Sequence, residues 1–296
     1  MDPFSGEGEL LNLTTAFYTH AYQTVLDFDT SALSSQNKSA AQILRYRAQI
    51  ATGNASSVIS SLRNAKDPAS RSILALAQHS SGDTSALSTA ESLAESDGED
   101  PVVQICAGTV LASAGEFAKA TELLSKHQGN LEAVALLVQI YLQQNRTHLA
   151  VKEVAAAKRW ANDSLLINIA EAWLHLRQGG QENYQSSFYV YEELATTPGN
   201  ASPTALVGQA VSEIHLGRWE EAEQALKQAT EVENADVEAI ANSIVLASIM
   251  GKKREEVAEL TRSLEAKKQD HAMLVDLQEK SDLFDQAAKK YSAKVA

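Results

Sequence analysis

Seven turn-forming residues recur at nearly constant spacing, and this periodicity constrains the fold more than any other feature of the chain. The intervals between them average about 33 residues, and apolar residues at helical spacing lie on both sides of each one. Glycine and asparagine tolerate the left-handed conformation that ends a helix, so each can close a short turn between two helices. A period near 34 residues predicts a solenoid of helical hairpins. The seven positions are Gly53, Gly82, Gly115, Asn145, Gly180, Gly217 and Gly251.

The segments that follow the turns repeat a small residue between larger ones. A small residue is needed where the two helices of a hairpin approach closely, and the larger residue fills the groove behind it. This pattern predicts that Trp219 is a packing residue and not one that stacks on a ligand. The three clearest sets are Phe117, Ala120 and Leu124, then Thr147, Ala150 and Val154, then Trp219, Ala222 and Leu226.

The chain is therefore predicted to be an all-α, tetratricopeptide-like helix–turn–helix solenoid that forms a right-handed superhelix. Few prolines and glycines (5 and 14) also disfavour a β-rich protein. We expect one solenoid domain over residues 1–296, with a short flexible N-terminus at about residues 1–9. The pattern is degenerate: Asn234 stands where a proline often closes such a repeat, and "RQGGQENYQ" is an insertion around Gly180.

Charge and special residues exclude several classes of function. A net charge of −13 disfavours nucleic acid and direct binding to an anionic membrane. The single Cys106 lies in an apolar context and is predicted to be a core residue, and the seven histidines include no pair at metal-binding spacing. Phosphate-binding, dinucleotide and nucleophile-elbow motifs are absent from the sequence. We therefore predict no enzymatic activity, no cofactor and no metal.

The first helix of each hairpin is expected to line the concave surface, where such arrays bind their partners. The side chains predicted to face inward are mostly apolar. They are Ile105, Thr109, Ala135, Gln139, Leu142, Ile167, Glu171, Leu174, Val207, Val211, Ile214, Ala241 and Val245, preceded by Ile43 and Ile50.

An exposed apolar face of this extent is unusual on a soluble monomer. Either the superhelix closes over its own interior, or another chain fills it permanently, and we favour the second alternative. A co-chaperone adaptor that captures short peptides would instead need inward Lys, Arg and Asn to grip a carboxylate. Asn242 is the one such candidate in the sequence.

Several segments resemble the epsilon subunits of coatomer, the COPI vesicle coat. They occur in the family's order between about residues 15 and 291, and the segment at 66–104 matches least. The most specific is "GQAVSEIHLGRWEEAEQAL"; the others are "TAFYTHAYQ", "ILRYRAQIA", "EAWLHLRQGGQENYQSSFYVYEELA" and "FDQAAKKY".

The resemblance implies a non-enzymatic structural subunit that binds and stabilises the C-terminal region of the coatomer alpha subunit. It implies contact with other coatomer subunits and with the membrane only through the assembled coat. The expected location is the cytoplasm, peripheral on Golgi membranes and COPI vesicles, in retrograde Golgi-to-ER and intra-Golgi transport. The absence of a basic, apolar leader at the N-terminus agrees with a cytosolic protein.

Overall fold

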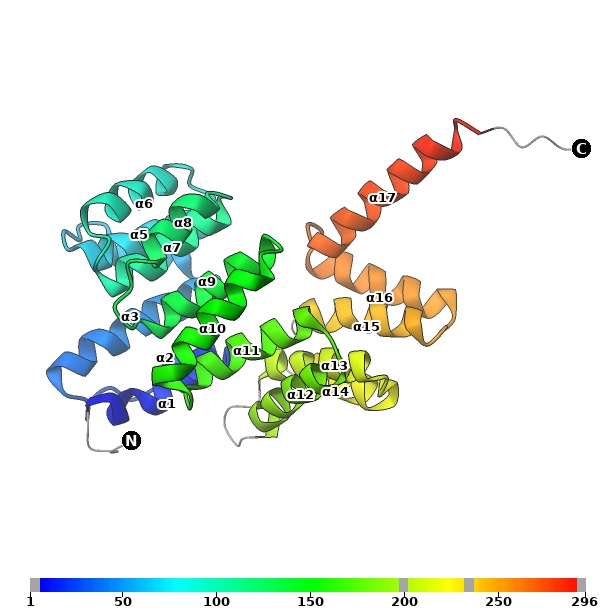
Figure 1. Cartoon of the computed structure of the whole chain (residues 1–296). Coiled ribbons are helices and arrows are strands. Elements are labelled where there is room, and N and C mark those ends of the chain that lie inside the picture. The colour runs from blue at the N-terminus through cyan, green and yellow to red at the C-terminus, as the bar shows by residue number, and fades with distance from the viewer. Residues whose placement is uncertain (1–5, 197–201, 232–236, 292–296) are drawn as a thin grey trace, which may run out of the picture. The chain divides into compact units, whose positions relative to one another are not determined.

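The computed structural model describes residues 6–196, 202–231 and 237–291, and all its regular elements in these ranges are α-helices (Figure 1). The chain divides into two compact units, Met1–Ala201 and Ser202–Ala296. The expected flexible N-terminus at about 1–9 lies partly outside the described residues, and the first helix begins at Gly6. The all-α prediction is confirmed.

Unit 1 contains two N-terminal helices followed by five hairpins. In each hairpin the first helix packs on its second helix, and the first helices of successive hairpins pack on one another. Its helices are α1 (Gly6–Tyr18), α2 (Tyr22–Asp27), α3 (Ser35–Ala51), α4 (Ala55–Leu62), α5 (Pro68–Ser80), α6 (Ser85–Ser96), α7 (Pro101–Ser113), α8 (Phe117–Leu124), α9 (Leu131–Gln143), α10 (Thr147–Ala161), α11 (Leu165–Gln178) and α12 (Gln181–Thr196).

Unit 2 continues the same pattern with two hairpins and a final helix. The hairpins pair α13 with α14 and α15 with α16, and α13 also packs on α15. Its helices are α13 (Pro203–Leu216), α14 (Trp219–Glu231), α15 (Val237–Ile249), α16 (Arg254–Lys267) and α17 (Ala272–Ala288).

The predicted turns are confirmed at all seven positions. Gly53, Gly82, Gly115, Asn145, Gly180, Gly217 and Gly251 have φ between 59° and 96°. In most of these turns the amide after the turn residue donates back to a carbonyl five residues earlier. Glu116 N donates to Leu111 O at 2.9 Å and Arg218 N to Glu213 O at 2.9 Å. These bonds satisfy carbonyls that the helix end leaves free and fix the reversal of the chain.

The beginnings of three first helices are also specified locally. Asp100 accepts hydrogen bonds from the amides of Val102 and Val103 at 2.7 and 3.1 Å, and Pro101 occupies the first helical position. Asp67 and Ser202 cap α5 and α13 in the same way, each followed by a proline. Proline fits there because the amide it lacks has no partner within the helix.

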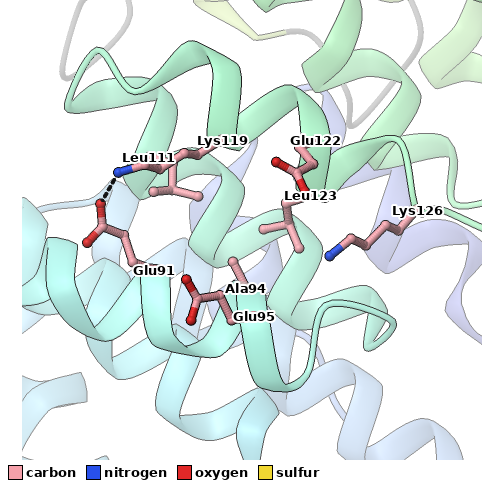
Figure 2. Close-up of a pocket in the computed structure, with 8 residues that line it drawn as sticks. All are labelled: Glu91, Ala94, Glu95, Leu111, Lys119, Glu122, Leu123 and Lys126. Carbon is pink, nitrogen blue, oxygen red and sulfur yellow. Dashed lines mark hydrogen bonds and ion pairs between the residues drawn. The ribbon is translucent and has the colours of Figure 1, made fainter.

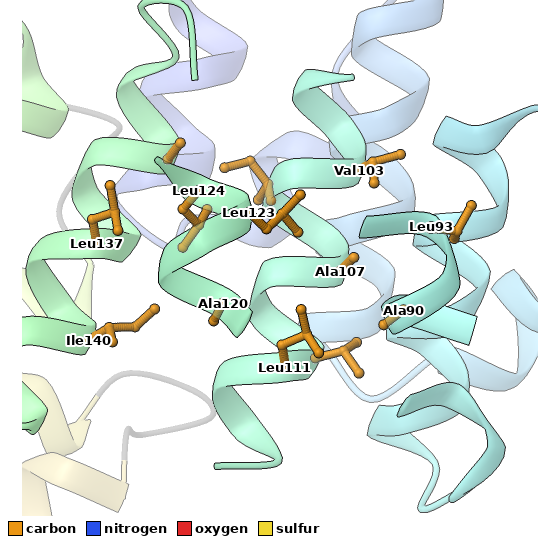
Figure 3. Close-up of a cluster of buried hydrophobic side chains, with 13 residues drawn as sticks. Ala90, Leu93, Val103, Ala107, Leu111, Ala120, Leu123, Leu124, Leu137 and Ile140 are labelled. Atoms are coloured by element: carbon orange, nitrogen blue, oxygen red, sulfur yellow. The ribbon is translucent and has the colours of Figure 1, made fainter. Parts of the chain in front are cut away.

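The hairpins are held together by buried alanine and leucine. Ala120 and Ala222 are fully buried where the paired helices meet. Leu111 and Leu123, from neighbouring helices, belong to the cluster of buried side chains that Figure 3 shows. Trp219 differs from its prediction, since its side chain is 44% exposed. Ala222 makes the close helix contact near the start of α14, while the Trp219 ring remains partly open to solvent.

Cys106 is buried in α7, as predicted for a core residue. Burial raises the pKa of its thiol to about 11, well above the value of an exposed cysteine. The thiolate is the reactive form of cysteine, so this side chain is chemically inert in the folded protein.

Replacing Gly115 with alanine is expected to destabilise unit 1. The glycine has φ +84°, and a side chain there meets no other atom, so the cost is backbone strain alone, about 1 to 2 kcal/mol. Urea unfolding monitored by circular dichroism should show a lower midpoint. Ser113→Ala, on the exposed end of the same helix, should not change it. An unchanged midpoint for Gly115→Ala would contradict the role given to this turn.

Cys106 should resist thiol reagents at pH 8 in the folded protein and react at once in denaturant. Because the folded pKa is the higher one, the unfolded chain loses its proton first, and the free energy of unfolding falls between about pH 9 and 11. The stability difference between wild type and Cys106→Ala should therefore shrink over that range. Fast labelling of the native protein would contradict the buried position.

Candidate functional site

A groove lined by apolar and aromatic side chains lies on the first helices of unit 1. One end is a cavity of about 220 Å³ formed by residues from α1, α3, α7, α9 and α11 and the segment after α1. The cavity shares Thr109, Leu136 and Gln139 with a second one of about 540 Å³ that continues along α7 and α9. The two cavities therefore form one continuous depression, which we call the inner groove.

A polar network forms one wall of the inner groove. Arg47 on α3 contacts Glu132 on α9 at 2.5 Å, although 85 residues separate them. Their side chains are 14% and 21% exposed. Burial opposes the guanidinium charge, but Glu132 outweighs that effect and keeps the pKa of Arg47 above its ordinary value. The ion pair connects the hairpin of α3 and α4 with the hairpin of α9 and α10.

The end of α1 covers part of the inner face. The Tyr18 hydroxyl donates to the second oxygen of Glu132 at 3.1 Å, and burial, with Glu132, raises the pKa of Tyr18. The Arg47 guanidinium lies 4.6 Å from the centre of the Phe17 ring, which is a cation–π contact. Tyr22 packs edge-on against Phe17 and stacks on His20. This N-terminal aromatic cluster narrows the groove without filling it.

The predicted inward residues divide into three groups. In unit 1, Ile105, Thr109, Ala135 and Gln139 line the inner groove as predicted. Leu142 lies against the core shared by α9, α10 and α11. In unit 2, Val211 and Ile214 are half-buried and Ala241 is buried, while Val245 is 40% exposed. Val207 is buried in the core of its own hairpin, so it is not a surface residue.

In α11 the structure places the three predicted residues outside the inner groove. Ile167 and Leu174 are buried in the hairpin core, and Glu171 forms an ion pair with Lys158 of α10 at 2.7 Å. The groove is instead lined by Leu166, Ile169 and Trp173. The groove residues of α7 and α9 stand six and ten positions before their turn residues. The same count gives Trp173 and Ile169 when it starts at Gly179, but Leu174 and Ala170 when it starts at Gly180.

Sequence reasoning also missed most of the groove wall. Arg47 and Glu132 come from helices far apart in the chain, and no local pattern links them. The aromatic cluster of "AFYTHAY" was a usable signal, because aromatic residues make up 6% of the chain and three of them fall within this segment of seven residues. Phe17, Tyr18 and Tyr22 all line the groove.

A second pocket, of about 290 Å³, lies between α6 and α8 on the outer side of the hairpins (Figure 2). Its rim carries carboxylates and lysines, and Lys119 contacts Glu91 at 2.6 Å. Leu111 and Leu123 form its floor. The rim carries three glutamates and two lysines, so its net charge is small. Among the residues that the structure describes, no group of His, Cys, Asp and Glu could hold a metal ion, here or elsewhere. This pocket offers no chemistry comparable with the inner groove.

Comparison with solved structures supports the fold. A tetratricopeptide repeat protein from Parabacteroides merdae aligns with a TM-score of 0.61 at 15% identity, covering 79% of this chain and 95% of that one. A chain of the APC/C hetero-tetramer Cut9–Hcn1 aligns with a TM-score of 0.63 at 13% identity, covering 90% of this chain and 54% of that one. The tetratricopeptide-like architecture predicted from the turn spacing is confirmed.

Comparison of sequences identifies the family. The probable coatomer subunit epsilon of Schizosaccharomyces pombe is 32% identical over 95% of this chain and 96% of its own length. Coatomer subunit epsilon-1 of Arabidopsis thaliana is 29% identical over 85% of this chain and 87% of its own length. The family model of the coatomer epsilon subunit matches residues 6–292. The chain therefore belongs to the coatomer epsilon subunit family, a family of non-enzymatic coat subunits.

Proposed function

We propose that this coatomer subunit binds the C-terminal region of the coatomer alpha subunit in the inner groove and stabilises it there. The observation that carries the proposal is the groove itself, which is apolar, aromatic-lined and continuous from Trp173 to Gln139. An extended segment buried on such a surface gains free energy in proportion to the apolar area removed from water. A permanent partner explains why so much apolar surface persists on the inner face.

The polar network gives the groove a fixed shape for this role. Arg47 and Glu132 satisfy each other and position Phe17 and Tyr18 around the cavity. Arg47 is the one Lys or Arg that lines the cavity, and it is already paired. Asn242, the one residue suited to a carboxylate clamp, donates its side-chain amide to the Glu238 carbonyl in its own helix. These pairings disfavour the peptide-capturing adaptor, which would need unpaired cations.

The proposed role places the chain in COPI vesicles, with retrograde Golgi-to-ER and intra-Golgi transport as its process. Recruitment to Golgi membranes would then depend on the assembled coat. No helix among the described residues is long and apolar enough to span a bilayer. The chain would accordingly contact other coat subunits, and the membrane, through the alpha subunit.

The direct test is co-expression with the C-terminal third of the alpha subunit from the same organism, followed by size-exclusion chromatography at high salt. An apolar interface is not screened by salt, so a one-to-one complex should persist. Separate elution of two folded proteins would refute the proposal and favour the adaptor.

Thr109→Trp should block the groove without adding a charge. Thr109 is half-buried and lines both cavities, and its hydroxyl donates to the Ile105 carbonyl at 2.7 Å. The indole would occupy space that the partner needs, so we expect at least about a 30-fold loss of affinity, or ~2 kcal/mol. Isothermal titration calorimetry on the purified proteins measures the affinity of the variant for the alpha-subunit region.

Thr121→Trp is the matched control for this substitution. Thr121 is also half-buried, and its hydroxyl donates to the Phe117 carbonyl at 2.9 Å, but it lies on the second helix of the same hairpin. Its affinity for the alpha subunit should equal that of wild type. Equal losses in the two variants would mean that general destabilisation, and not occlusion of the groove, caused the effect.

Val245→Asp tests whether unit 2 also contacts the alpha subunit. Val245 is 40% exposed on α15, so aspartate there should leave the fold intact while placing a charge in an apolar contact. We expect affinity to fall by ~2 kcal/mol. Val207→Asp should instead unfold unit 2, because Val207 is buried in the hairpin core. Unaltered binding by a folded Val245→Asp variant would restrict the interface to unit 1.

A further inference from the structure

The final helix of unit 2, α17, has an apolar face that nothing in the described chain covers. None of its residues is buried. Its first turn is anchored, because Met273 and Leu274 pack on the cluster around Ile244 and Leu264. Beyond that turn the large apolar residues are open to solvent: Leu277 is 53%, Leu283 63%, Phe284 72% and Tyr291 82% exposed.

The position of α17 in the repeat pattern explains this exposure. In unit 2, α13 packs against α14 and α15 against α16, so each first helix is covered by its second helix. After α16 the chain forms α17, which packs on the cluster of α15 and α16 through Met273 and Leu274 and then extends away from them (Figure 1). Within the described residues no second helix follows it. The face that such a helix would cover is therefore left without a partner.

The exposed residues form one stripe with a seven-residue period. Leu277 and Phe284 are seven residues apart on α17 and Ala287 lies on the same face, while Tyr291, a further seven residues on, follows the end of the helix. A heptad stripe of this kind packs against another helix. The opposite side of α17, which includes Gln278 and Asp282, lines the space beside α16. The stripe therefore lies on the side of α17 that faces away from α16.

The charges that flank the stripe are self-complementary. Asp276 lies near the start of α17, where it also pairs with Lys280 of its own helix, and Lys290 lies just after the end of the helix. Asp276 and Lys290 stand one position before Leu277 and Tyr291, respectively. If two copies of the helix run antiparallel, Asp276 of each copy faces Lys290 of the other, and Leu283 faces Leu283 on the two-fold axis. A parallel pair would instead place like charges opposite each other.

We propose that two copies of this chain associate through an antiparallel pair of α17 helices, with Leu277 and Phe284 of each copy in the interface. Each α17 then supplies the second helix that the other lacks, in the antiparallel orientation of the other hairpins. The interface is isologous, as expected of a homodimer with two-fold symmetry. It involves no residue of the inner groove and is independent of the alpha subunit.

The first test is sedimentation equilibrium of the full-length chain at about 1 to 100 µM and low salt. We expect wild type to pass from monomer to dimer within this range. Leu277→Ser and Phe284→Ser should each remain monomeric with an unchanged circular dichroism spectrum, because both side chains are exposed in the monomer. A wild-type chain that stays monomeric at the highest concentration would overturn the proposal, whichever other surface covers the stripe.

A charge exchange tests the antiparallel register. Asp276→Lys and Lys290→Asp should each weaken the dimer at least about ten-fold, because two attractive pairs become repulsive. Mixing the two variants in equal amounts should restore dimerisation: the two altered positions face each other with opposite charges, and so do the two unaltered ones. Asp285→Lys is the matched control, since it makes the same charge change away from the stripe. A mixture that stays monomeric would refute the register and with it the proposal.

Discussion

The close approach of two helices around one left-handed residue is the constraint on which this structure depends. Each of the seven hairpins reverses at a glycine or asparagine with positive φ, which sets where the second helix starts. The fully buried Ala120, Ala150 and Ala222 then let the helix axes come near enough for leucines to interlock. With few aromatic residues available, this contact between small and branched side chains supplies most of the core.

The inner groove depends on contacts of a different kind. Repetition alone would produce a uniform apolar face on α7, α9 and α11. The N-terminal segment modifies that face, because Tyr18 and Phe17 pack over it and the pair of Arg47 with Glu132 fixes them in place. A buried ion pair adds little net stability but penalises alternative arrangements. The groove is therefore formed by the repeated first helices together with one specific ion pair, Arg47 with Glu132.

Unit 2 differs from unit 1 in how it treats an apolar helix face that has no partner helix. In unit 1 the surplus apolar surface is partly covered by helices of the chain itself. On α17 it stays open, with Phe284 and Tyr291 among the most exposed apolar side chains described. A heptad stripe with charges of opposite sign at its two ends is suited to a second helix of the same sequence. The two surfaces would serve different partners: another subunit at the groove and another copy at α17.

The sequence by itself determined the helical hairpins, because the residues that end a helix and the alanines at helix contacts act within one repeat. It also determined the groove faces of α7 and α9, where counting back from Gly115 and Asn145 places Thr109 and Gln139 correctly. Only the tertiary structure decided the face of α11, since a second glycine left its register ambiguous by one residue. The pairing of Arg47 with Glu132 was likewise beyond the sequence, because it depends on how successive hairpins stack.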